Sequence, residues 1–301
     1  MKAKFSAIVI MTLVFSLSGV TAQAIEGGES AKNHPRVVSL YFQSANPAYK
    51  YDGCSAFLYA PRIVVTQAHC LFDYDTNKKL PAAKVFVGAP GRVINTRGPS
   101  FQVKKIYMPS GYENSRTPAH STMDIAILVT SKSVSKVPVA SPISKAAFDE
   151  LVSSGGSVTV GGYGLSSVKE RGMGSRNNFK FPRKLTAKLV QRDVVENFMN
   201  SSFARQQTLS GWRDPALIEK YGWVGTNPSI GATCDGDSGS GFFIENGKQT
   251  IFVGANGGPM GSPNCSKNGQ WYSDGGLNKI IPIFMYSELL TAALEFEAKL
   301  K

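Results

Sequence analysis

A serine lies among small residues in the segment Cys234–Gly241, which reads Cys-Asp-Gly-Asp-Ser-Gly-Ser-Gly. Glycine permits tight turns and lets backbone N–H groups approach a reacting atom closely. The amides of Gly236 and Ser238 could therefore converge on the oxygen of a tetrahedral intermediate and form an oxyanion hole. An acidic Gly/Ser turn is often only a turn, so the segment predicts catalysis only if a base and an acid accompany it.

A serine hydroxyl becomes a good nucleophile when a base takes its proton and a third group orients that base. The chain has three histidines, so the candidate bases are few. His69 ends an apolar, β-branched run, whereas His34 precedes a proline and His120 lies in a polar stretch. Asp124 begins another apolar run, where a carboxylate is costly to bury without a partner. Each residue alone also fits a purely structural role.

The chain order His69, Asp124, Ser238 is that of chymotrypsin, and the sequence resembles the trypsin/chymotrypsin-like serine peptidase family. Further segments carry the same resemblance, and it spans essentially residues 25–301. These segments are the start at Ile25–Gly28, the strand Pro35–Leu40, the stretch Cys54–Cys70, the turn Gly162–Gly164 and the final helix.

The resemblance implies a serine endopeptidase that hydrolyses peptide bonds through an acyl-enzyme. His69 would take the proton of Ser238 during attack on the carbonyl and return it to the leaving amine. Asp124 would hold the tautomer of His69 and stabilise its charged form. No cofactor is expected, and no histidine pair or C-x-x-C motif has the spacing of a zinc site.

The resemblance also assigns roles to Ile25 and Asp237. Ile25 would be the mature N-terminus, and its ammonium would pair with Asp237, the acid before the nucleophile. Losing one partner of such a buried pair costs about 3–5 kcal/mol. Because no pro-segment separates the leader from Ile25, we expect export itself to yield active enzyme. Glu26 departs from the family pattern, which more often has an apolar residue there.

The first 24 residues have the features of a secretory signal peptide. Lys2 and Lys4 form a positive end, Phe5–Val20 is apolar, and Ala22–Ala24 supplies an Ala-x-Ala cleavage site. A membrane anchor is the alternative, but the run is shorter than the roughly 20 apolar residues that a span needs. We therefore expect a secreted or periplasmic protein with no membrane span.

The cysteine content agrees with export. Four cysteines in an oxidising compartment suggest two disulfides, with three possible pairings. The family resemblance selects Cys54–Cys70, beside the histidine, and Cys234–Cys265, which would join the serine loop to the opposite wall of a pocket.

The chain is basic, with a formal net charge of +12. Eight basic residues fall within 169–192, and this segment could bind anionic surfaces or could simply be a solvated loop. They are Lys169, Arg171, Arg176, Lys180, Arg183, Lys184, Lys188 and Arg192. The segment has no aromatic interleaving of the kind that reads nucleic acid. We expect a monomer that binds proteins or peptides as substrates.

Short apolar runs separated by Gly, Pro, Asn and Ser predict an all-β protein, and 301 residues suffice for a large core. The resemblance implies two six-stranded antiparallel Greek-key barrels, about 25–137 and 138–301, with a C-terminal helix. Predicted first-barrel strands are Val37–Phe42, Ser55–Tyr59, Ile63–Thr66, Lys84–Val87, Phe101–Tyr107 and Ile125–Val129. Those of the second barrel are Val158–Gly161, Leu185–Val190, Gly241–Glu245, Thr250–Val253 and one near Gln270–Ser273.

Helices are predicted at three internal segments and at the C-terminal end. The internal segments are Ser144–Leu151, Val194–Ala204 and Pro215–Tyr221. At the end of the chain, apolar residues recur at helical spacing and define one face. They are Met285, Leu289, Ala293, Phe296 and Leu300.

Specificity is expected to depend on Ala232 and Thr233, just before Cys234. Trypsin-like members that bind Lys or Arg have an acid at the position of Ala232, so a basic preference is not expected. The Gly239–Gly241 pattern resembles glutamate-cleaving relatives, which also place a histidine in the pocket. After Cys70 the chain has no histidine except His120, so a preference for Glu is not expected. We expect a small or apolar side chain at the cleaved bond.

Two other classes of function remain open at this point. A catalytically silent homologue used for binding or adhesion would fail to react with a fluorophosphonate probe. A basic envelope-binding protein would show salt-sensitive binding to anionic surfaces without proteolysis.

Overall fold

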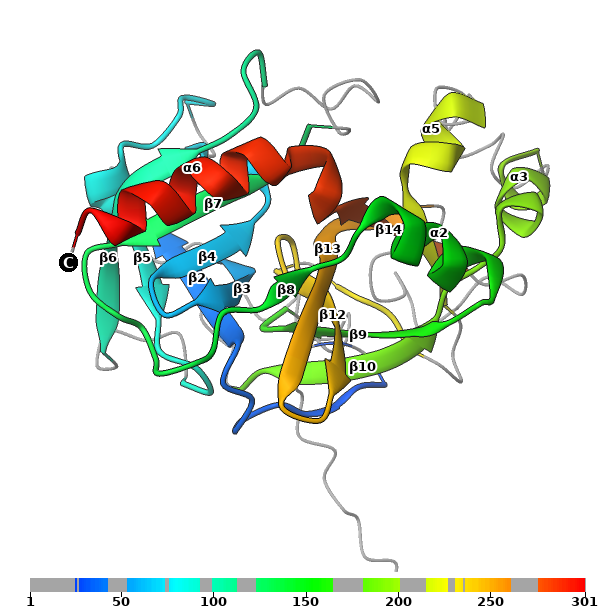
Figure 1. Cartoon of the computed structure of the whole chain (residues 1–301), viewed down its shortest axis with the longest axis horizontal. Helices are drawn as coiled ribbons and strands as arrows, with labels where there is room; N and C mark the ends of the chain where they lie inside the picture. Colours follow the sequence, from blue (N-terminus) through cyan, green and yellow to red (C-terminus); the bar gives the residue numbers. More distant parts are fainter. Residues whose placement is uncertain are drawn as a thin grey trace, which may run out of the picture.

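The computed structural model describes residues 25, 27–42, 53–73, 76–92, 99–112, 123–164, 181–200, 215–226, 231–234, 236–260 and 276–300. Two β-sheet lobes lie side by side, and the last helix crosses from the second lobe to cover the first (Figure 1). The leader 1–24 and the strand predicted near Gln270–Ser273 lie outside the described residues.

The first lobe is a closed barrel of antiparallel strands in the order β2-β3-β4-β7-β6-β5. The strands are β2 (Val37–Phe42), β3 (Gly53–Ala60), β4 (Ile63–Thr66), β5 (Val85–Gly88), β6 (Ser100–Tyr107) and β7 (Ala126–Thr130). Successive side chains of a strand point to opposite faces. Ala56 and Leu58 of β3 therefore pack inside the barrel, and Phe57 and Tyr59 pack between the lobes. Six predicted strands are confirmed within one or two residues.

The described strands of the second lobe agree with the predicted all-β fold, and they form an open sheet where the sequence predicts a second barrel. The described strands form an eight-stranded sheet in the order β1-β10-β9-β12-β13-β14-β11, and β8 pairs with β13 off this path. Among the residues that the structure describes, the isolated bridge Leu189↔Val224 joins the chain after β10 to β11, and the described strands form a half-barrel. The strands are β1 (Glu29–Ser30), β8 (Ser141–Pro142), β9 (Ser157–Gly162), β10 (Arg183–Lys188), β11 (Gly222–Thr226), β12 (Gly241–Asn246), β13 (Gln249–Met260) and β14 (Gly276–Pro282).

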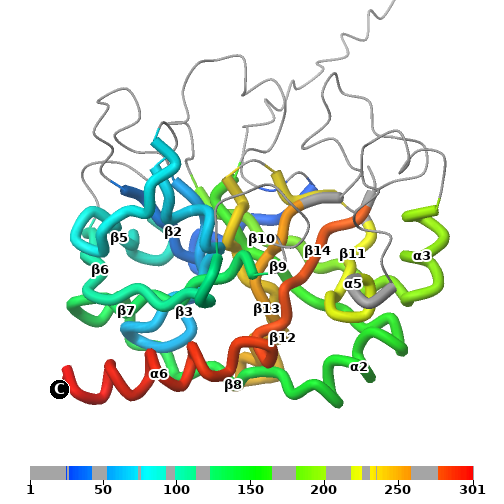
Figure 2. The backbone as a smooth tube through the Cα atoms, turned by 90° about the horizontal axis from the view of Figure 1, so that it is seen from above, coloured from blue at the N-terminus to red at the C-terminus, as the bar shows by residue number. Residues whose placement is uncertain are grey.

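The described helices are α2 (Lys145–Ser153), α3 (Arg192–Asn200), α5 (Pro215–Lys220) and α6 (Ser287–Ala298), with short 3₁₀ segments η2 (Ala68–Leu71), η3 (Ala82–Lys84) and η6 (Ile283–Tyr286). Figure 2 shows α6 along the outside of the first lobe and α2, α3 and α5 beside the second lobe. The Ser144 hydroxyl caps α2 by accepting a hydrogen bond from the Ala147 amide. All four predicted helices are present within the described residues.

The lobes meet through aromatic packing and through the hydrogen bonds of the buried Arg36. Phe57 of β3 stacks on Phe252 of β13, with ring centroids 4.6 Å apart. Arg36, only 3% exposed, donates hydrogen bonds to Thr250 Oγ1 of the second lobe and to the carbonyls of Leu58 and Pro138. A five-donor guanidinium is well suited to join three segments in this way.

No described helix is long and apolar enough to cross a membrane.

Candidate active site

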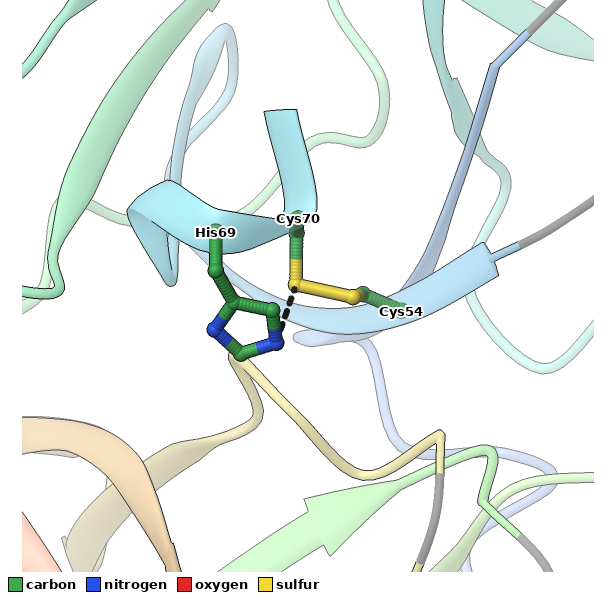
Figure 3. Close-up of side chains that lie close together, drawn as sticks. All are labelled: Cys54, His69 and Cys70. Atoms are coloured by element: carbon green, nitrogen blue, oxygen red, sulfur yellow. Dashed lines mark hydrogen bonds between the residues drawn. A yellow bond between two sulfur atoms is a disulfide. The ribbon is translucent and has the colours of Figure 1, made fainter. Parts of the chain in front are cut away.

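His69 lies on η2, directly after the fully buried strand β4. Its neighbour Cys70 forms the predicted disulfide with Cys54 of β3, so the position of η2 is tied to the barrel wall. Figure 3 shows the imidazole beside this bridge, with Nε2 3.8 Å from Cys70 Sγ. Cys54, His69 and Cys70 cluster closely enough to suggest a metal site, but both sulfurs are consumed by the disulfide.

Asp124 lies two residues before β7 and is 8% exposed. Its Oδ1 accepts a hydrogen bond from the His69 backbone amide, and its Oδ2 lies 2.8 Å from His69 Nδ1. A carboxylate only accepts, so Nδ1 must carry the proton in this pair. The unprotonated Nε2 is then available as a base, on the side of the ring that faces the disulfide.

The electrostatics of this pair favour proton uptake by the imidazole. Burial lowers the pKa of His69, but the charge of Asp124 and the hydrogen bond to it outweigh burial, and the pKa rises above its usual range. Burial raises the pKa of Asp124, but the charge and hydrogen bonds of His69 outweigh this effect and lower the pKa. The carboxylate therefore stays ionised while the imidazole accepts a proton.

Two further side chains donate to Asp124, and the sequence reasoning did not identify either. Gln67 Nε2 lies 2.8 Å from Asp124 Oδ2, and the Tyr112 hydroxyl lies 3.2 Å from Oδ1. Burial and the neighbouring Asp124 both raise the pKa of Tyr112, so it remains a neutral donor. Gln67 stands two residues before His69, but nothing in the local pattern of residues shows that it reaches across to Asp124.

The turn around Ser238 depends on glycine. Gly236 and Gly239 have φ values of +92° and +79°, in the region that other residues rarely adopt. A Cβ on Gly239 would lie 2.0 Å from Thr66 Oγ1, so this turn packs tightly against the end of β4. Ser238 remains partly exposed, while Asp237 and Ser240 beside it are fully buried.

Ser55 of β3 fixes the same turn from the first lobe, and it is a further residue that sequence reasoning missed. Its amide donates to the Ser238 carbonyl at 2.9 Å, and its hydroxyl donates to the Gly236 carbonyl at 2.8 Å. Cys70 Sγ lies 3.8 Å from the Ser238 carbonyl oxygen, as it does from His69 Nε2. The base and the serine residue therefore meet at one disulfide.

Asp237 is fully buried on the opposite side of the turn. Its two carboxylate oxygens accept hydrogen bonds from the amides of Gly164, at 2.7 Å, and Cys234, at 2.8 Å. A Cβ on Gly164 would lie 2.5 Å from Asp237 Cγ, so the glycine is required there. Ile25 is also fully buried, and its pairing with Asp237 stays a prediction.

Ala232 and Thr233, the predicted specificity residues, are each 1% exposed. Among the described residues, Thr233 Oγ1 and Asn278 Oδ1 are buried without a hydrogen-bond partner. Unpaired buried polar atoms are uncommon and often mark a binding site. The second predicted disulfide stays a prediction, because Cys265 lies outside the described residues, as does the first half of the basic segment 169–192.

A buried cation approaches the pair from the second lobe. Lys279 of β14 is 1% exposed, and its Nζ lies 5.2 Å from the ring centroid of Tyr221. A Cβ on Gly257 would lie 2.4 Å from Lys279 Cε, so the glycine leaves space for the lysine stem. Burial lowers the pKa of Lys279 to about 7, against the opposing attraction of Asp124. The sequence reasoning did not identify this lysine.

These features define the class: a closed β-barrel beside a half-barrel, with an Asp–His pair facing a serine turn, is the architecture of a trypsin-like serine peptidase. The family model described as Trypsin matches residues 25–272, and the chain belongs to this family. A search of curated proteins finds no match to the sequence.

Proposed function

We propose that the protein is a serine endopeptidase in which Ser238, His69 and Asp124 form the catalytic triad. The observation that carries this proposal is the 2.8 Å contact between Asp124 Oδ2 and His69 Nδ1. It leaves Nε2 as the base on the side where the Ser238 backbone approaches the disulfide. Membership of the trypsin family supports the same reaction.

In this proposal, His69 Nε2 takes the Ser238 hydroxyl proton as the oxygen attacks a peptide carbonyl. The imidazolium then gives that proton to the leaving amine, and an acyl-enzyme remains for water to hydrolyse. Asp124 stabilises the charged ring throughout. The amides of Gly236 and Ser238 form the oxyanion hole, and the bonds from Ser55 to both carbonyls support that arrangement.

We further propose that the mature chain begins at Ile25 and that its ammonium pairs with Asp237. Ile25 has a φ of +54°, a costly conformation for a β-branched residue within a chain. An N-terminal residue has no φ angle, so cleavage before Ile25 removes this strain. This observation supports removal of residues 1–24 during export, and the Cys54–Cys70 disulfide suits an oxidising compartment outside the cytoplasm.

The proposed specificity excludes Lys and Arg as the primary side chain. Ala232 supplies no negative charge to receive them. We propose a small or apolar side chain instead, with proteins or peptides as substrates.

Reaction with a fluorophosphonate probe and cleavage of a peptide library test this function together. The purified mature protein should label and cleave, and Ser238→Ala should lose both activities by about 10⁴-fold or more. A folded wild type that neither labels nor cleaves would identify a silent homologue. Cleavage that persists at full rate in Ser238→Ala would show that another group is the nucleophile.

A further inference from the structure

The side chain of Gln67 connects the two halves of the site. It follows β4 directly and is 2% exposed. Its Nε2 lies 2.8 Å from Asp124 Oδ2, and its Oε1 lies 2.8 Å from the amide nitrogen of Gly239, the residue after Ser238. One buried amide thus contacts both the acid of the first lobe and the serine turn of the second.

The chemistry of the partners fixes the orientation of this amide. The Asp124 carboxylate can only accept, so the NH₂ group of Gln67 must face it. The Gly239 amide can only donate, so the carbonyl oxygen of Gln67 must face that group. A leucine or methionine could fill the space but make neither bond, and a carboxylic acid could make both only when protonated.

We propose that Gln67 is a positioning residue for catalysis, which holds the Asp124 carboxylate and the Ser238–Gly239 peptide in a fixed relation. The inference rests on the proposed peptidase function and deepens it. Gln67 does not touch the reacting atoms. It acts through Asp124, which it orients for His69, and through the peptide that follows the nucleophile.

The peptide after Ser238 is held on both of its polar atoms. Ser55 binds the Ser238 carbonyl at 2.9 Å, and Gln67 binds the Gly239 amide. Loss of Gln67 would leave that buried amide unpaired and free the turn to shift relative to the base. A misplacement of about 1 Å can reduce a catalysed rate by about 100-fold.

Gln67 also shares Asp124 Oδ2 with His69 Nδ1, so it competes for the same charge. Within the described part of the chain, the other ionisable groups that interact with this carboxylate are Tyr112 on its Oδ1 side, Lys279 of β14 and Tyr286 of η6. The two tyrosines have pKa values that burial and Asp124 raise, to about 12 for Tyr286, so both remain neutral near pH 7. Burial lowers the pKa of Lys279 to about 7, but this lysine is present in the wild type as well, so its titration is common to both proteins. A new carboxyl at position 67 would be the ionisable group that differs between them, at the position where Gln67 contacts Asp124 Oδ2.

Two substitutions separate a positioning role from a merely structural one. Gln67→Leu removes both bonds and should lower kcat by about tenfold to 100-fold with KM within about twofold. Gln67→Glu keeps an acceptor for Gly239 and donates to Asp124 only when protonated. Repulsion by Asp124 raises the pKa of the new carboxyl. Its kcat relative to wild type should therefore be highest at low pH and fall as the pH rises and the acid ionises.

Two controls accompany these variants. Gln249→Leu removes a surface glutamine that bonds Ser141 Oγ, and it should keep wild-type kcat and pH dependence. Tyr112→Phe removes one donor to Asp124 but none to Gly239, so its loss of kcat should be smaller than that of Gln67→Leu. Equal losses in these two variants would contradict a role for the contact with Gly239.

A measurement without turnover keeps this inference separate from the proposed function. In Ser238→Ala protein, NMR of the His69 Nδ1 proton should show a changed chemical shift and titration when Gln67→Leu is added. A wild type that does not label with fluorophosphonate ends the peptidase proposal, whereas this NMR change would still report the contact. The positioning role would be overturned if Gln67→Leu changes neither the NMR titration of His69 nor kcat. It would also be overturned if the NMR titration is unchanged and a lower Tm alone explains the loss of kcat.

Discussion

The two lobes hold their buried carboxylates in opposite ways. Asp124, beside the closed barrel, accepts hydrogen bonds from the side chains of Gln67, Tyr112 and His69 as well as from one backbone amide. Asp237, in the half-barrel, accepts hydrogen bonds from the backbone amides of Gly164 and Cys234. Gly164 has no room for a side chain, because a Cβ there would lie 2.5 Å from Asp237 Cγ. The side-chain donors to Asp124 can be replaced one at a time by substitution. The amides that bind Asp237 belong to the backbone, so no substitution removes one of them without changing the path of the chain.

This difference predicts that substitutions at Asp124 lower kcat in a protein that still folds. Substitutions around Asp237 should lower the free energy of unfolding. Side chains on rigid strand ends can lose one bond while the barrel persists. The turn around Asp237 is packed so closely that an atom added at Gly164 must displace its neighbours.

The largest effect should follow Asp124→Asn. An N–H of the new amide facing His69 would favour the tautomer with the proton on Nε2, which then cannot act as the base. We therefore expect kcat to fall by about 10⁴-fold. Circular dichroism should show a folded protein at the assay temperature. A loss below tenfold in a folded variant would mean that the carboxylate does not serve the base.

A stability change should follow Gly164→Ala. The added Cβ would lie 2.5 Å from Asp237 Cγ and displace the carboxylate from its amides, so the free energy of unfolding should fall by about 2–3 kcal/mol. Chemical denaturation measures this change. Gly225→Ala is the matched control in the same lobe, because its nearest neighbour is a Val190 methyl at 3.3 Å. Equal stability of the two variants would break the contrast between the lobes.

The smallest effect concerns the second lobe itself, where Lys279 of β14 passes Gly257 of β13. Gly257→Ala should destabilise the protein because its Cβ would lie 2.4 Å from Lys279 Cε. In a Lys279→Ala background that obstacle is gone, so the two substitutions should show a favourable coupling of about 1 kcal/mol. Additive losses in the denaturation double-mutant cycle would show that the two side chains do not share this space.

Local patterns in the sequence predict most of the first barrel. Its strands are short, buried and bounded by turn residues, so both their existence and their limits follow from neighbouring residues. His69, Asp124 and Ser238 could be selected because their residue types and chain order are distinctive. The strand β11 was missed, since its place in the sheet depends on pairing with the distant strand β14.

The supporting residues of the site could not be predicted for the same physical reason. Gln67 and Gly239 are 172 positions apart, and Ser55 and Gly236 are 181 apart. A glutamine or serine in a strand-end sequence is ordinary by itself, and its partner is determined only when the lobes pack together. The buried position of Lys279 could not be predicted either, because a lysine in a strand normally lies at a solvent-exposed position.

The path of α6 makes the first lobe depend on residues that lie far along the chain from its own strands. α6 packs on β7, the strand that follows Asp124, and Arg62 of the first lobe donates to the carbonyl of Leu300. The barrel therefore receives its outer layer from a segment that lies far along the chain from the barrel strands. A chain cut short before Ser287 would leave this apolar side of the barrel exposed to water.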